Sequence, residues 1–207
     1  IDFSLVIWYD KKMEHKSKGV SDMTNSAVLN KPKLSAKAQT IAAAGAVIAA
    51  VVLPQIFHIM GAMSGLGTKL GEVFLPMHLP VILVGLLAGP YTGAAAGLLS
   101  PLASFGLTGM PTAAMLPFMM IELCVYGLAS GLLRSAKLPI IAKVLIAQIS
   151  GRAVRAAAIA FAVYVLGSDK IPLSVIWTSI SVGIFGLALQ WTFIPLAVYR
   201  IENRSKE

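Results

Sequence analysis

The chain has 207 residues, of which 57% are hydrophobic and only 13% are charged, and its mean hydropathy is +0.80. Soluble domains contain about 25% charged residues, so this composition excludes an ordinary soluble protein. A formal charge of +8 would suggest nucleic-acid binding in a soluble chain, but most basic residues here lie near the ends of apolar segments, where they set membrane topology.

The first 37 residues predict a cytoplasmic extension ahead of the membrane fold. Residues 1–22 mix acidic residues with lysines and contain no apolar run long enough for a secretory signal. A more ordinary start, Met-Thr-Asn-Ser, begins at Met23. We therefore interpret residues 1–22 as non-native or as translated from upstream of the native start, with Met13 as an alternative start.

The first apolar segment predicts a membrane helix over residues 38–57. Ala42, Ala46 and Ala50 recur every four residues and give this helix a flat face that another helix can approach closely. Such a face suits either packing inside the bundle or contact with a partner subunit. Residues 58–73 predict a long connection to the next helix, and loops longer than about 12 residues often form lids or binding loops.

Three further apolar segments predict helices over residues 74–88, 91–107 and 113–133. Pro76 and Pro80 predict an irregular start to the first of these helices. Irregular backbone at membrane depth is tolerated only where it lies against protein or lines a water-filled cavity. His78 lies in this irregular region, and Glu122 lies about 13 Å into its own helix, close to the middle of the membrane. An unpaired charge there costs about 2.5 kcal/mol or more, so both residues are candidate site residues.

The last two apolar segments predict helices over residues 140–166 and 172–198. Arg152 and Arg155 are three residues apart and therefore share one helix face. They lie roughly 16 to 21 Å from the outer end of their helix, a depth that overlaps Glu122 on the antiparallel neighbour. Tyr126 and Trp177 can form stacking or hydrogen-bonding walls beside these charged groups.

The six predicted helices form an all-α membrane bundle over residues 38–199, followed by a cytoplasmic tail over residues 200–207. Basic residues concentrate on the cytoplasmic side of membrane proteins. A cytoplasmic amino terminus satisfies this rule because it leaves only Lys69 and Lys170 on outer connections, and six crossings return the carboxyl terminus to the cytoplasm. The basic residues then placed inside are Lys31, Lys33, Lys37, Arg134, Lys137, Arg200, Arg204 and Lys206.

The sequence lacks the motifs of common enzymatic sites. It has no Gly-rich phosphate loop ending in Lys-Ser or Lys-Thr, which excludes ATP hydrolysis by this chain. Three scattered histidines and one cysteine, Cys124, give neither a metal-ligand spacing nor a disulfide. We expect no catalytic residue, no metal and no bound cofactor. The remaining enzymatic alternative is an intramembrane serine protease that pairs His78 with Ser100 or Ser104.

A polar cluster in the apolar bundle is the candidate binding site. If Glu122 neutralises one of the two arginines, the other can bind a ligand carboxylate or phosphate through two parallel hydrogen bonds. Alternatively, both arginines share Glu122, or one of them extends toward a helix end. The predicted substrate-binding residues are His78, Glu122, Tyr126, Arg152, Arg155 and Trp177.

Motifs spread over the membrane segment resemble those of the substrate-binding S-components of energy-coupling factor (ECF) vitamin transporters. The resemblance covers about residues 38–199. Each motif alone is a weak signal, but the motifs together are fairly specific for this family. The motifs are Phe74-Leu-Pro-Met-His-Leu-Pro80, Gly89-Pro90, Gly93 with Gly97, Gly109-Met110-Pro111 and Glu122-Leu-Cys-Val-Tyr-Gly127.

The resemblance implies a non-enzymatic, six-helix protein of the bacterial plasma membrane that binds one vitamin near its extracellular side. The loop between helices one and two serves as a lid in that family, and residues 58–73 occupy the matching place. In members of that family, an Ala-x-x-x-Ala pattern on helix one contacts the transmembrane coupling subunit. Ala42, Ala46 and Ala50 match this pattern. That subunit and two ATPases, which use the ATP, would supply the energy.

The Pro-Met-His-Leu-Pro segment looks most like the branch associated with pantothenate, whose carboxylate suits a surplus arginine. Hydroxymethylpyrimidine, pyridoxine, folate and cobalamin are the competing ligands, and a neutral pyrimidine would leave Arg152 and Arg155 tied up internally. The rival interpretation is a non-transporting membrane assembly subunit, in which the charged residues serve folding alone.

Overall fold

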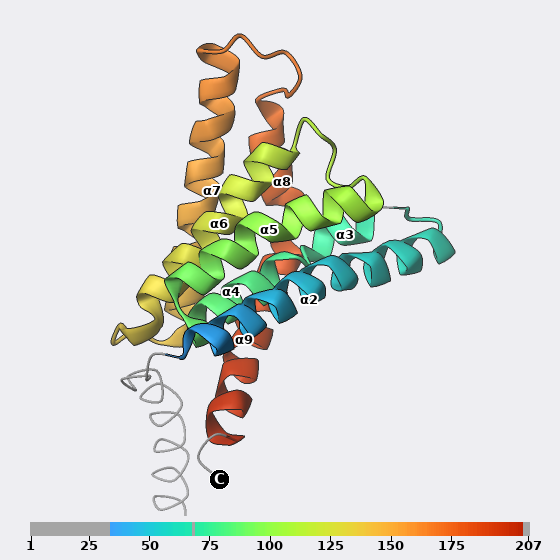
Figure 1. Ribbon diagram of the computed structural model, residues 1–207. Helices are drawn as coiled ribbons and strands as arrows, with labels where there is room; N and C mark the ends of the chain where they lie inside the picture. The colour runs from blue at the N-terminus through green and yellow to red at the C-terminus, as the bar shows by residue number, and fades with distance from the viewer. Residues whose placement is uncertain (1–33, 68, 205–207) are drawn as a thin grey trace, which may run out of the picture.

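A computed structural model describes residues 34–67 and 69–204 of the chain, and every regular element in these ranges is helical (Figure 1). Most of the predicted amino-terminal extension and residues 205–207 lie outside the described residues. The helices are α2 (Ala36–Met63), α3 (Lys69–Phe74), α4 (His78–Ala88), α5 (Pro90–Thr108), α6 (Leu116–Leu132) with a 3-10 turn (Leu133–Ser135), α7 (Ile140–Tyr164), α8 (Ser174–Val182) and α9 (Ile184–Arg204).

Five helical stretches of the described chain are long and apolar enough to cross a membrane, which indicates a multi-pass membrane protein. Helix α5, the third predicted crossing, has 19 residues, but its Gly, Ser, Thr and Pro residues make it less apolar than the five stretches. The all-α prediction is thus confirmed, whereas a count of six crossings goes beyond what length and composition support. The five stretches are Ala36–Met63, Lys69–Ala88, Leu116–Ser135, Ile140–Tyr164 and Ile184–Ile201.

The predicted connection over residues 58–73 is wrong in length, because most of these residues are helical. Helix α2 continues through Pro54 to Met63, and α3 begins at Lys69. The Ile, Met and Ala residues after position 58 favour a helix, and the chain turns only at Gly65 and Gly67, which have positive φ angles of 75° and 58°. A short turn therefore stands where a long lid was expected.

Two of the long apolar segments are interrupted, and their interruptions lie side by side. The predicted irregular start of the second segment is confirmed: Leu75 adopts a φ of 48° between α3 and α4. The second interruption, at Gly183 between α8 and α9, was not predicted. A methyl group added to Gly183 would lie 2.7 Å from Leu75 Cδ1, and one added to Gly186 would meet the backbone of Phe74.

Helices α5 and α6 touch through their backbones along a line of glycines that we call the glycine seam: Gly93 and Gly97 of α5, and Gly127 and Gly131 of α6. A methyl group added to Gly93 would overlap the carbonyl of Gly127, and the reverse also holds. Small residues spaced by four allow this approach, and in a membrane such packing is a main source of helix association.

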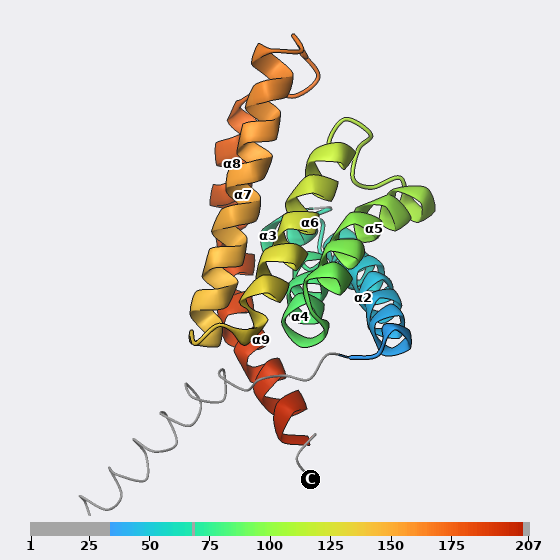
Figure 2. The same ribbon diagram turned by 60° about the vertical axis from the view of Figure 1, so that its left-hand side comes forward.

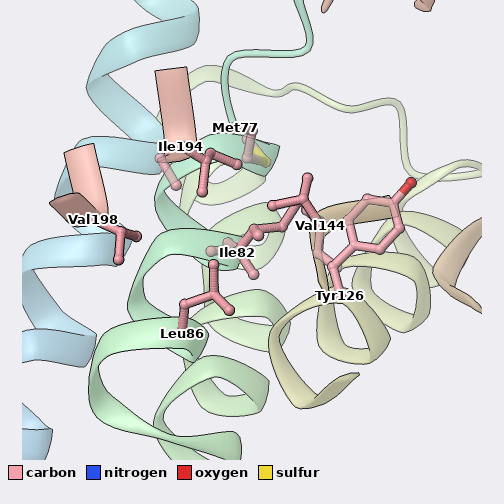
Figure 3. Close-up of a cluster of buried hydrophobic side chains, with 10 residues drawn as sticks. Met77, Ile82, Leu86, Tyr126, Val144, Ile194 and Val198 are labelled. Carbon is pink, nitrogen blue, oxygen red and sulfur yellow. The ribbon is translucent and has the colours of Figure 1, made fainter. Parts of the chain in front are cut away.

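The hydrophobic core lies between α4, α6, α7 and α9. Figure 3 shows side chains from these four helices converging on one cluster. The labelled members are Met77, Ile82, Leu86, Tyr126, Val144, Ile194 and Val198. This cluster and the glycine seam hold α4 and α6 in the centre of the protein, and α6 presents its polar residues to α7.

The alanine face of α2 points into the protein. Ala46 and Ala50 are buried, and Ala42 packs against the same cluster as Ala46, while Ile41 and Ile48 on the opposite face are exposed. The structure supports the internal-packing interpretation of this face, because all three alanines belong to or pack against buried clusters of the chain itself. In both ribbon views α7 and α8 run side by side, away from α2 and α5 (Figures 1 and 2).

Candidate functional site

The centre of the site is an ion pair between α6 and α7. Arg155 Nη1 lies 2.9 Å from Glu122 Oε2, as the estimated depths of the two residues predicted. The hydroxyl of Tyr126, one turn further along α6, donates a hydrogen bond of 2.9 Å to Glu122 Oε1. Glu122 is only 1% exposed, so both of its oxygens are held by protein groups in a site closed to solvent.

A glycine on α7 allows the two helices to meet here. Gly151 lies one turn before Arg155, and a methyl group at this position would overlap the ring of Tyr126. The same methyl group would lie 2.9 Å from the carbonyl oxygen of Glu122. The absence of a side chain at Gly151 therefore lets Tyr126 fill the interface and keeps Glu122 within reach of Arg155.

His78 extends this row of polar side chains to α4. It is the first residue of α4, directly after the interruption, and its ring centroid lies 5.3 Å from that of Tyr126 at a tilt of 52°. His78 is buried, and its Nδ1 has no hydrogen-bond partner in the described part of the chain. His78, Tyr126, Glu122 and Arg155 thus form a continuous row from α4 through α6 to α7.

Arg152 has a different kind of partner. Its Nη1 donates a hydrogen bond of 3.2 Å to the carbonyl oxygen of Ser179, in the last turn of α8. The carbonyls of a last turn lack helical partners and carry the negative end of the helix dipole, so they attract a guanidinium. Within residues 34–67 and 69–201, no carboxylate forms an ion pair with Arg152, and its buried Nε has no hydrogen-bond partner.

Both arginines line one small pocket between α7 and α8. The pocket has space for about one water molecule, which is too little for a vitamin. A larger ligand could enter only after α7 and α8 separate. Apart from Arg152 and Arg155, the lining is mostly apolar, and it consists of Ala156, Ile159, Ile176, Ser179 and Ile180.

Trp177 does not belong to this site. Ile176, Ser179 and Ile180 share the face of α8 that lines the pocket, and Trp177 is turned away from it with 73% of its surface exposed. The prediction that Trp177 forms a wall of the site is therefore corrected. An outward indole near a helix end is typical of the interface between membrane and water, where Trp is enriched.

A hydrogen-bonded chain that we call the glutamine network lies next to the site and was missed by the sequence interpretation. Trp191 Nε1 donates to Gln148 Oε1 at 2.7 Å, and Gln148 Nε2 donates to Gln190 Oε1 at 3.0 Å. Gln190 Nε2 in turn donates to the carbonyl of Leu75 at 3.4 Å. Two uncharged amides inside apolar segments were the available signal, but the candidate site was built around the charged residues and neither glutamine was included.

The serine-protease alternative has no hydrogen bond to support it in the described residues. The Oγ of Ser100 donates to the carbonyl of Ala96 at 2.6 Å, and the His78 ring lies against Tyr126. Ser104 is buried on the same helix as Ser100, without a hydrogen bond to His78. Neither serine is therefore arranged as a nucleophile activated by this histidine.

Comparisons of the chain with known protein families, with curated proteins and with solved structures gave no match. Its function is therefore inferred from the geometry of Glu122, Arg155 and Arg152 and from the sequence motifs described above.

Proposed function

We propose that this chain is the substrate-binding membrane subunit of an ECF-type importer and that it binds an anionic vitamin between α7 and α8. The observation that carries the proposal is Arg152, a guanidinium inside an apolar bundle whose partner is a neutral carbonyl. A membrane-embedded charge without a counter-charge is expensive and marks a functional site. Guanidinium groups bind carboxylates through two parallel hydrogen bonds, so the missing partner is an anion.

Pantothenate is the ligand we propose for this pocket. Its carboxylate would pair with Arg152, and its geminal methyl groups would lie against Ile159, Ile176 and Ile180. Its hydroxyl and amide groups could donate to the carbonyl of Ser179, which Arg152 would release on binding the ligand. A neutral hydroxymethylpyrimidine or pyridoxine offers no charge to Arg152, and folate and cobalamin are larger ligands.

The proposed arrangement has six crossings, with α5 as the third, in a bacterial plasma membrane. The start of α2 and the ends of α6 and α9 lie at one end of the bundle, and the α7–α8 connection lies at the other (Figure 1). Arg134 and Lys137 follow α6, and Arg200 lies in α9, so the positive-inside rule places that end in the cytoplasm. The pocket between α7 and α8 then lies toward the outer half.

Energy for uptake would come from a transmembrane coupling subunit and two ATPases, with no cofactor bound by this chain. Because Ala46 and Ala50 are buried in its own core, the exposed face of α2 around Ile41 and Ile48 is the surface we propose for the coupling subunit. Gly45 lies between these residues with open space beside it, so a partner helix can approach the α2 backbone there.

Equilibrium binding of radiolabelled pantothenate to the purified, detergent-solubilised chain tests the proposal. We expect saturable binding that pyridoxine and hydroxymethylpyrimidine do not displace. Arg152→Gln should weaken binding by at least about tenfold, since a lost charged hydrogen bond costs roughly 1.5 to 3 kcal/mol. The matched control is Arg200→Gln, an exposed arginine near the end of α9, which should bind like the wild type.

Displacement of another bound vitamin, with no binding of pantothenate, would reassign the ligand and leave the transport role. No saturable binding of any vitamin, together with normal assembly of Arg152 variants, would favour the assembly-subunit alternative.

A further inference from the structure

The two arginines of the pocket share one face of α7 but differ in their electrical environment. Arg155 contacts a carboxylate at 2.9 Å, whereas Arg152 contacts a carbonyl at 3.2 Å. Both side chains line the pocket between α7 and α8. A ligand that enters between these helices therefore meets one compensated and one uncompensated guanidinium.

Glu122 pairs with Arg155 and not with Arg152 in this arrangement. One of its oxygens accepts from Tyr126 and the other from Arg155, and its carboxylate is almost completely buried. Charge-assisted hydrogen bonds are stronger than neutral ones, so the bonds from Tyr126 and Arg155 hold the carboxylate beside Arg155, while Arg152 bonds to the carbonyl of Ser179. Gly151 adds to this restraint because it lets the Tyr126 ring pack directly against α7.

Two guanidinium groups and one carboxylate leave the pocket with a single positive charge. Glu122 does not itself line the pocket and enters this balance through its ion pair with Arg155, whereas His78 lies against the Tyr126 ring and forms no ion pair in the described part of the chain. In an apolar site, each charge without a partner is costly, whether it belongs to the protein or to the ligand. A neutral ligand would leave Arg152 uncompensated, and a dianion would bring in a carboxylate that has no free guanidinium.

From this charge balance we infer that Glu122 is a specificity-determining residue that restricts the site to monoanionic ligands. It acts by occupying Arg155, so only Arg152 is open to a ligand carboxylate. The inference rests on the proposed function and refines it, because it states the ligand charge that the site accepts. It also assigns Glu122 a role without contact between Glu122 and the ligand.

Three probes of similar shape test the inference: pantothenate, its neutral alcohol panthenol, and N-pantoyl-aspartate, which carries a second carboxylate. The wild type should bind pantothenate at least about tenfold more tightly than either analogue, the effect expected of one charged hydrogen bond. Glu122→Gln should reverse the order in favour of N-pantoyl-aspartate, because it releases Arg155. Arg155→Gln should favour panthenol, because Glu122 then cancels the charge of Arg152.

The double variant Glu122→Gln/Arg155→Gln is the decisive control. It restores a single positive charge, that of Arg152, and removes both charges of the buried ion pair together, so it should prefer pantothenate again and remain folded if Glu122→Gln does not. A purely structural role for Glu122 predicts that the double variant loses this preference.

The possible failures can be separated. Wild-type protein that binds none of the three probes contradicts the proposed function and the inference with it. Wild-type protein that binds pantothenate, with variants whose preference does not follow the pocket charge, overturns the inference alone.

Discussion

The α5–α6 contact and the α7–α8 contact differ in what lies between the helices. Along the glycine seam the backbones touch, and no side chain separates Gly93 from Gly127. Between α7 and α8 lie two arginine side chains and a small pocket, and among the described residues Arg152 alone is hydrogen-bonded to α8. Close backbone packing gives a rigid frame, whereas a contact through one hydrogen bond can open for a ligand.

The ion pair of Glu122 joins these two regions, and breaking it should have the largest effect on stability. Glu122→Leu leaves Arg155 as a buried charge without a partner, so the free energy of unfolding should fall by about 3 to 5 kcal/mol. Unfolding in mixed detergent micelles measures this change. The double variant Glu122→Leu/Arg155→Leu should regain most of the loss, and a single-variant loss below about 1 kcal/mol would mean that the pair is not essential.

The rigid region can be tested with one added methyl group. Gly127→Ala should lower the free energy of unfolding by about 1 to 3 kcal/mol, because the new Cβ overlaps the Gly93 backbone and pushes α5 from α6. Gly106 lies on α5 with open space beside it, so Gly106→Ala should instead stabilise by up to about 1 kcal/mol through helix propensity. If both substitutions changed the free energy of unfolding in the same direction, that result would argue against the glycine seam.

The glutamine network should have an intermediate effect. Gln190→Leu leaves the Gln148 amide without its acceptor and removes one of the two hydrogen bonds to the Leu75 carbonyl, which still accepts from the His78 backbone N–H. This loss should cost about 1 to 2 kcal/mol in the same unfolding measurement. Gln55→Leu is the matched control, since Gln55 is half-buried on α2 and outside the network, and it should change stability by less than about 0.5 kcal/mol. Equal losses in the two variants would contradict a role for the network.

A substitution in the contact between α7 and α8 should have the smallest effect on stability. Arg152→Gln removes a hydrogen bond but also removes an uncompensated charge from the bundle, so the free energy of unfolding should change by less than about 1 kcal/mol in either direction. The same variant should nevertheless lose ligand binding. A loss of stability as large as that of Glu122→Leu would make Arg152 a structural residue and would remove the contrast between the two regions.

The elements that could be predicted from sequence are those governed by local chemistry or by depth. Pro76 and Pro80 predicted the irregular region at Leu75. The positions of Glu122 and Arg155 along antiparallel helices predicted that the two residues lie at the same depth in the bundle. Both inferences needed only proline geometry and the rise of a helix.

The elements that were missed depend on how helices are rotated against one another. Trp177 and Ile176 are neighbours in an apolar run, and only the packing of α8 on α7 decides which of them faces the pocket. Gly183 interrupts a segment whose apolar pattern continues on both sides, and glycine within a membrane helix is common. The continuation of α2 past His58 was missed because the Gly and Ser residues of this stretch were given more weight than its helix-favouring Ile, Met and Ala residues.

The hydrogen bond from Gln190 to the carbonyl of Leu75 also constrains the order in which the chain is assembled. The two residues are 115 positions apart, whereas the glycine seam joins consecutive helices. Contacts between successive helices can form as each one leaves the insertion machinery, and the Leu75 carbonyl then has the backbone N–H of His78 as its local donor. Its second donor, Gln190, lies on α9. We therefore expect α3 to α6 to assemble before α9, which then adds a second hydrogen bond to a break made more than one hundred residues earlier.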